Sequence, residues 1–156
     1  MAAIASHHAP PREASHVRLN MYERLGLAAV ALACLSVLII ASTLTPSPVG
    51  YGTHSQLGLP PCGWVVRFGK PCLTCGMTTA FAAAAHVQPI TSIRAQPMGA
   101  ALAVVTALLV WLAGYSAITG SLLLTTIVRM AGWKLAWISL GGLLAAWAYK
   151  WFTFGP

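Results

Sequence analysis

Two long stretches without a charged side chain constrain this chain most. Residues 25–45 and 98–119 are almost entirely apolar and contain no Asp, Glu, Lys, Arg or His. An apolar run of about 18 or more residues can cross the hydrocarbon core of a bilayer as a helix. A third stretch, residues 133–152, is interrupted only by Lys134 and Lys150 near its ends, whose ammonium groups we expect to reach the two membrane surfaces. The sequence therefore predicts an all-α integral membrane protein with three transmembrane helices, at about residues 25–45, 98–119 and 133–152.

The composition agrees with this fold class and excludes several others. Hydrophobic residues make up 58% of the chain and charged residues 7%, whereas soluble domains average about 25% charged residues. The two acidic residues, Glu13 and Glu23, both precede the first span, so the spans hold no carboxylate pair for glycoside hydrolysis. The net charge is +7, but the Lys and Arg residues are scattered beside the spans. They predict contact with membrane lipids, with a membrane protein as a further candidate partner, and no nucleic acid.

The chain divides into an amino-terminal arm and one membrane domain. Residues 1–24 are polar and basic and are predicted to be disordered or juxtamembrane, and residues 25–156 form a single helical membrane domain. The first apolar run is longer than the core of a signal peptide, so we do not expect it to be cleaved. With three spans and the amino terminus inside, five cations face the cytoplasm and four face the other side. This weak bias places the connector between the first two spans outside, where disulfides can form.

Three of the four cysteines, Cys62, Cys72 and Cys75, lie in that connector, within residues 46–88. The five prolines and five glycines of residues 46–71 exclude a continuous helix or a long strand. A short helix is expected from Pro71 to Pro89, re-entrant or lying at the membrane interface, and it would carry the C-x-x-C pair. A helix starting at Pro71 would place five residues on one face: Cys72, Cys75, Thr79, Ala83 and His86. Its dipole, with Arg67 and Lys70 just upstream, would favour thiolates.

The cysteines admit three hypotheses. In the first, Cys62 forms a structural disulfide with Cys72 or Cys75 and holds the loop against the helix. In the second, Cys62, Cys72 and Cys75 bind Zn²⁺, with His54 or water as the fourth ligand. In the third, Cys72 and Cys75 cycle between dithiol and disulfide, with Cys62 as a resolving thiol. A single C-x-x-C does not choose among them. Zn²⁺ is the one cofactor these residues indicate.

The same residues resemble a known family. Cys62, followed after nine residues by Cys72-x-x-Cys75-Gly76-Met77-Thr78 and later by Gln96-Pro97, is similar to bacterial membrane proteins grouped as domain of unknown function 2752, with the pattern C-x9-C-x2-C-G-[LM]-T. The fuller family pattern is C-P, a short linker and then C-P-x-C-G-[LM]-T-R, and this chain departs from it at three positions: Gly63 and Leu73 replace prolines, and Thr79 replaces an arginine. The resemblance implies a small multi-pass protein of the bacterial cell membrane and supplies no activity.

Together these observations predict a non-enzymatic membrane component with a structural cysteine cluster, held by a disulfide or zinc. The alternative is a membrane thiol–disulfide oxidoreductase that uses the C-x-x-C pair. The spans carry no charge near their centres, so transport is the weaker hypothesis.

Overall fold

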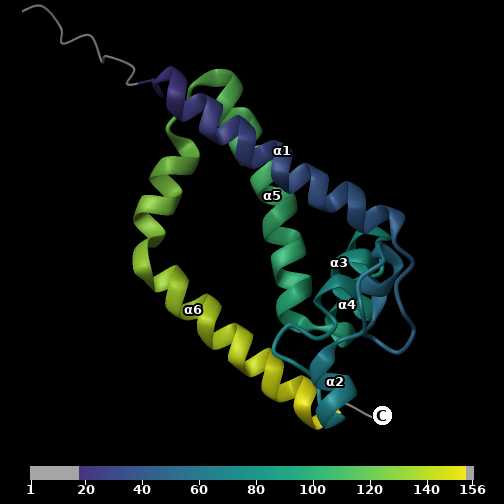
Figure 1. The fold of residues 1–156 in the computed structure, drawn as a ribbon. Helices are drawn as coiled ribbons and strands as arrows, with labels where there is room; N and C mark the ends of the chain where they lie inside the picture. The colour runs from purple at the N-terminus through teal and green to yellow at the C-terminus, as the bar shows by residue number, and fades with distance from the viewer. Residues whose placement is uncertain (1–17, 154–156) are drawn as a thin grey trace, which may run out of the picture.

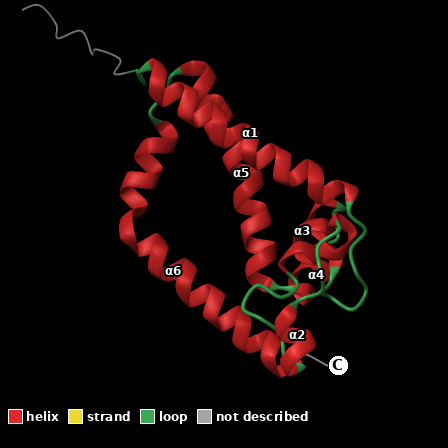
Figure 2. Ribbon diagram, viewed as in Figure 1, coloured by secondary structure: helices red, strands yellow, loops and turns green. Residues whose placement is uncertain are grey.

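The structure is a computed structural model that describes residues 18–153, and within that range it contains helices and no strands (Figures 1 and 2). Residues 1–17, most of the predicted amino-terminal arm, lie outside the described range. The elements in chain order are α1 (Met21–Thr43), the 3₁₀ helix η1 (Thr53–Leu57), α2 (Gly63–Phe68), α3 (Met77–Ala85), α4 (Pro89–Ala95), α5 (Pro97–Thr119) and α6 (Leu123–Thr153).

Three of these helices, α1, α5 and α6, are long and apolar enough to cross a membrane. Their order and number agree with the three predicted spans, and the all-helical fold class is confirmed. Figure 1 shows α1 and α5 side by side and antiparallel, with α6 running back toward the start of α5. The ends of α1 and α6 and the start of α5 therefore lie at one end of the molecule, together with α2, α3 and α4.

At the opposite end of the molecule, the start of α1 is bound to the end of α5. Asn20 and Glu23 form a capping box, so α1 begins at Met21, four residues before the predicted span. The Arg24 guanidinium donates hydrogen bonds to the carbonyl oxygens of Ala117 and Ile118, each at 2.8 Å. These carbonyls lie in the last turn of α5, where a cation compensates the partial negative charge of the helix end.

The third span differs from the prediction because α6 begins at Leu123 rather than at residue 133. Most of the segment between the second and third predicted spans is therefore helical as well. Gly132 interrupts α6 with φ 50° and ψ −152°, a backbone conformation that favours glycine, so the helix bends there. The predicted span 133–152 corresponds to the part of α6 that follows this bend.

A small cluster of α3 and α4 packs against α1 and the start of α5. The start of α5 approaches α3 closely at Gly99. A Cβ added to Gly99 would lie only 2.9 Å from the Ala80 Cβ. The Ser92 hydroxyl donates to the Ala80 carbonyl at 2.7 Å and joins α4 to α3. The chain does not run irregularly from Pro89 to the second span, because Pro89 begins α4 and occupies its first turn, where a missing N–H costs nothing.

Candidate thiol site

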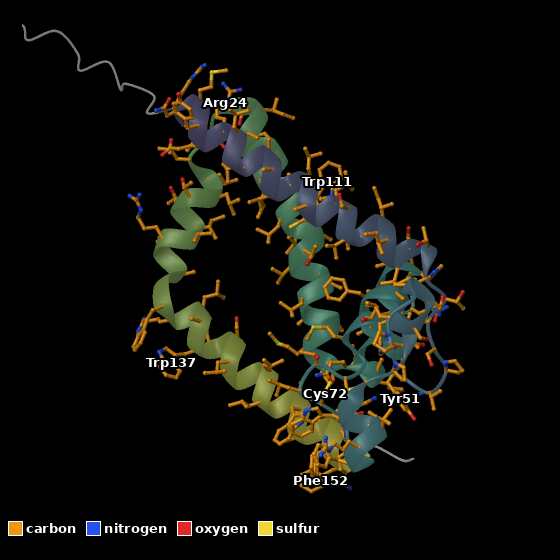
Figure 3. The ribbon with its side chains drawn as sticks, in the orientation of Figure 1. Arg24, Tyr51, Cys72, Trp111, Trp137 and Phe152 are labelled. Atoms are coloured by element: carbon orange, nitrogen blue, oxygen red, sulfur yellow. The ribbon has the colours of Figure 1, made fainter. Side chains whose placement is uncertain are left out.

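Cys62, Cys72 and Cys75 line one pocket of about 340 Å³ at the end of the molecule that holds α2, α3 and α4. Tyr51, Gly52 and His54 contribute another wall of this pocket, and Thr79 lines it from α3. Figure 3 shows Cys72 and Tyr51 at this end, near the end of α6. The fourth cysteine, Cys34, lies in α1 and is not part of the pocket lining. The folding of a proline- and glycine-rich loop therefore gathers three thiols around one cavity.

The C-x-x-C pair lies in two successive turns that precede α3. The Cys75 N–H donates to the Cys72 carbonyl at 3.1 Å, and the Met77 N–H donates to the Thr74 carbonyl at 3.1 Å. Gly76 then adopts φ 88°, and α3 starts at Met77. The prediction that a helix from Pro71 carries the pair was therefore wrong. A residue with positive φ cannot continue a right-handed helix, and Gly76 takes that conformation without a steric penalty.

Because α3 begins only at Met77, some of the residues predicted to lie beside the cysteines do so and others do not. Thr79 lines the pocket with the cysteines, as the expected helical face required. His86 does not line the pocket; its Nε2 lies 3.0 Å from the Leu44 carbonyl, beyond the end of α1. Arg67 and Lys70 were expected to favour thiolates, but their charged groups lie over aromatic rings, Arg67 at 6.0 Å from the Phe68 ring centroid and Lys70 above α6.

The three thiols have different surroundings. Burial of Cys75, together with the nearby Cys72 and Cys62, raises the pKa of Cys75 to about 11, so this thiol stays protonated at neutral pH. Burial alone would also raise the pKa of Cys62. The net shift is nevertheless downward, because the backbone N–H groups of Val65 and Trp64, together with Cys72, favour the Cys62 thiolate through hydrogen bonds.

Cys72 interacts with both of the other cysteines. Its side chain is half-buried, interacts with Cys62 and lies with its sulfur 3.7 Å from the Thr74 hydroxyl. The pocket thus presents a partly exposed thiol with a lowered pKa beside a second partly exposed thiol, and a third thiol that is buried. A lowered pKa with partial exposure is the environment of reactive cysteines in proteins.

The zinc hypothesis placed His54 or water beside the three cysteines as the fourth ligand. His54 does line the same pocket, but its Nε2 lies 3.2 Å from the Pro60 carbonyl. Among residues 18–153, no group of three or more His, Cys, Asp or Glu side chains is close enough to hold a metal ion. The side chains as placed therefore do not fit a tetrahedral zinc site, and zinc binding stays a prediction.

Thr53 and Thr79 fix the shape of the pocket. Their hydroxyl oxygens are 2.8 Å apart and fully buried, which joins η1 to α3. The Thr53 hydroxyl also accepts a hydrogen bond from the Ser47 N–H at 3.1 Å. These buried hydrogen bonds order the loop without requiring a disulfide between its thiols.

Sequence reasoning missed Lys150 as part of this end of the molecule. It was expected to reach a membrane surface, but its side chain is only 6% exposed. Its Nζ donates hydrogen bonds to the Ala95 carbonyl at 3.0 Å and to the Gly50 carbonyl at 3.3 Å. Its positive charge also lowers the pKa of Cys75 slightly, against the larger effect of burial. A lysine inside an apolar stretch is itself a signal of a functional position.

The fold and the site together define a helical protein with three candidate membrane-spanning helices and a three-thiol pocket at one end. Residues 62–110 match the sequence model of a family described as protein of unknown function (DUF2752), which is the family that the cysteine pattern resembles. The match includes all three pocket cysteines and ends within α5. No curated protein matches the chain, and no solved structure matches it.

Proposed function

We propose that this protein is a multi-pass component of the bacterial cell membrane that exchanges thiols and disulfides through Cys62 and Cys72. The observation that carries the proposal is the interaction of these two partly exposed side chains at the pocket, with the pKa of Cys62 lowered. The sequence suggested the C-x-x-C pair as the exchanging cysteines. The geometry favours Cys62 with Cys72 instead, because burial and the raised pKa make Cys75 the least reactive of the three thiols.

The exchange follows from the two environments. The Cys62 thiolate attacks one sulfur of a partner disulfide, forms a mixed disulfide and releases the other partner sulfur as a thiolate. The Cys72 thiol then gives its proton to the released partner thiolate and attacks the Cys62 sulfur, which releases the second partner sulfur as a thiolate. The partner disulfide is reduced by two electrons, and the Cys62–Cys72 pair is oxidised to a disulfide. The reverse sequence oxidises a partner dithiol.

The arrangement of the spans supports a location for this chemistry. The pocket lies at the end of the molecule opposite Arg24. If the amino-terminal end is cytoplasmic, as the charge bias predicts, the pocket opens on the outer side of the membrane. Disulfides form and persist there, and a membrane protein or an exported protein with a disulfide is the expected partner.

A second candidate function is a structural disulfide between the same two residues, in a non-enzymatic membrane component. It is favoured by the position of Cys62 at the start of α2 and of Cys72 just after its end, because a bond between them would enclose α2. Closing a loop of this size removes unfolded-state entropy worth roughly 3 kcal/mol. Such a bond would stabilise the fold and would not exchange with partners.

The test is a redox titration of the purified protein in lipid nanodiscs against glutathione buffers, followed by acid trapping of thiols and peptide mass spectrometry. Exchange predicts a Cys62–Cys72 disulfide that equilibrates with the buffer, is lost in Cys62→Ser and Cys72→Ser, and persists in Cys34→Ser. Structural disulfides resist glutathione, with potentials below about −300 mV. A bond that no glutathione ratio reduces, with lowered thermal stability in Cys62→Ser, would assign the structural function. Four thiols that stay reduced in every buffer would refute both functions.

A further inference from the structure

Two tryptophans in the last turns of α6 contact the segment that directly precedes Cys72. The Trp147 Nε1–H donates to the Pro71 carbonyl at 3.4 Å, and Pro71 directly precedes Cys72. The Trp151 ring lies beneath the Lys70 ammonium, with 5.4 Å from Nζ to the ring centroid. α6 is otherwise little buried, since its most apolar 18-residue window contains no buried residue. Two of the three buried residues of α6, Ala146 and Lys150, lie in these last turns, and the third, Leu124, lies at its start.

Lys150 lies at the centre of these contacts. Its ammonium binds the carbonyl oxygens of Gly50 and Ala95, which belong to the loop and to the end of α4. The same two oxygens pack closely against Gly76. A Cβ added to Gly76 would lie 2.6 Å from the Gly50 oxygen and 2.7 Å from the Ala95 oxygen. Three separate segments thus meet at one cation, and the residue beside Gly76 is Cys75.

Burying this ammonium is costly without strong compensation. Residues 18–153 contain one carboxylate side chain, Glu23, which caps α1 at the other end of the molecule. The two carbonyl dipoles therefore take the place of a counter-ion for Lys150. In return the ammonium allows two carbonyl oxygens to approach the same point, where their partial negative charges would otherwise repel each other.

We propose that Lys150 is a positioning residue of the thiol site, whose ammonium holds the loop at Gly50 and the end of α4 against Gly76, and so keeps Cys75 buried and Cys72 beside Cys62. The effect on exchange rests on the proposed function, because holding two thiols together raises their effective concentration and favours the disulfide. The burial of Cys75 follows from the packing alone and does not depend on that function.

The experiment compares Lys150→Met with Lys150→Arg and with Lys134→Met, which removes an exposed lysine from the same helix. The first readout is labelling of Cys75 by a bulky maleimide in nanodiscs, with peptide mass spectrometry. The second is the equilibrium constant of the Cys62–Cys72 disulfide with glutathione. We expect Lys150→Met to label Cys75 about tenfold faster and to lower that constant about tenfold, as expected for losing a charge-assisted hydrogen bond. Lys150→Arg and Lys134→Met should resemble the wild type.

Each outcome decides a separate question. Labelling of Cys75 at the wild-type rate in a folded Lys150→Met protein overturns the positioning role, whatever the disulfide does. A wild-type protein that forms no Cys62–Cys72 disulfide refutes the proposed exchange, while the labelling comparison still tests Lys150. If circular dichroism shows that Lys150→Met is unfolded, Lys150→Gln replaces it. That variant loses the charge but keeps an amide donor, and its labelling rate must also exceed that of the wild type.

Discussion

Replacing Gly76 with alanine tests whether the close approach of three segments beside Cys75 holds the site together. Gly76 has φ 88° and ψ −2°, and an added Cβ would lie 2.6 and 2.7 Å from two backbone oxygens. Gly52 supplies a matched control, because its φ of 86° and ψ of −2° are almost the same and no atom lies within 4 Å of its added Cβ. The two substitutions therefore share the backbone strain and differ in the steric clash.

The expected magnitudes follow from these two contributions. A left-handed backbone conformation costs a residue with a Cβ about 1–2 kcal/mol. Overpacking adds about 1–3 kcal/mol, with the upper end expected at Gly76 because both contacting atoms belong to the backbone. Gly52→Ala should thus cost about 1.5 kcal/mol and Gly76→Ala about 4 kcal/mol. For a chain of this size, 1 kcal/mol lowers the thermal midpoint by roughly 3 °C, so the expected shifts are about 4.5 °C and about 12 °C.

The assay is thermal unfolding in nanodiscs, followed by circular dichroism, for the wild type and both variants. Labelling of Cys75 by a bulky maleimide at 25 °C provides a local readout. We expect Gly76→Ala to expose Cys75 and Gly52→Ala to leave it protected. A thermal midpoint for Gly76→Ala equal to or above that of Gly52→Ala would refute the close approach, because the shared backbone strain would then account for the whole effect.

Three further predictions concern other contacts. Arg24→Met removes the hydrogen bonds to the end of α5 and should lower stability by about 1 kcal/mol. The loss is modest because solvent weakens the attraction between the exposed guanidinium and the carbonyl oxygens. Thr79→Val removes the buried hydroxyl pair with Thr53 and should cost about 1–2 kcal/mol of stability. In the reduced protein, Cys62 has a lowered pKa and Cys75 a pKa of about 11, so thiolate forms first at Cys62 as the pH rises. Alkylation should therefore reach half its maximal rate below pH 9 at Cys62 and near pH 11 at Cys75, as measured by peptide mass spectrometry.

Each of these predictions has a control. Arg129→Met removes an exposed arginine from α6, and a loss of stability equal to that of Arg24→Met would contradict the role of the α5 carbonyls. Thr43→Val alters an exposed hydroxyl that bonds within its own helix, and it should be nearly neutral. A neutral effect of Thr79→Val would contradict a stabilising pair. Equal alkylation profiles at the two cysteines would contradict the difference in their environments.

The candidate site was predictable in its residue types and not in its geometry. The cysteine spacing singled out Cys62, Cys72 and Cys75, and all three line one pocket. The helix expected to carry the pair begins only after Gly76, because the conformation of that residue is set by close packing against Gly50 and Ala95. Alanine-rich composition predicts a helix but does not fix its first residue, since the preceding turns depend on contacts distant in sequence.

By itself the sequence determined the three long apolar helices and the family pattern in the connector. Both are local properties, because hydrophobic length and residue spacing act within one segment. The tertiary structure decided that Lys150 is buried, that His86 bonds to the end of α1 and that α6 ends beside the thiol pocket. A lysine near a helix end can extend to a membrane surface or turn inward to carbonyl oxygens. That choice depends on whether another part of the chain brings carbonyls within reach, which only the packing of Gly50 and Ala95 around Gly76 determines.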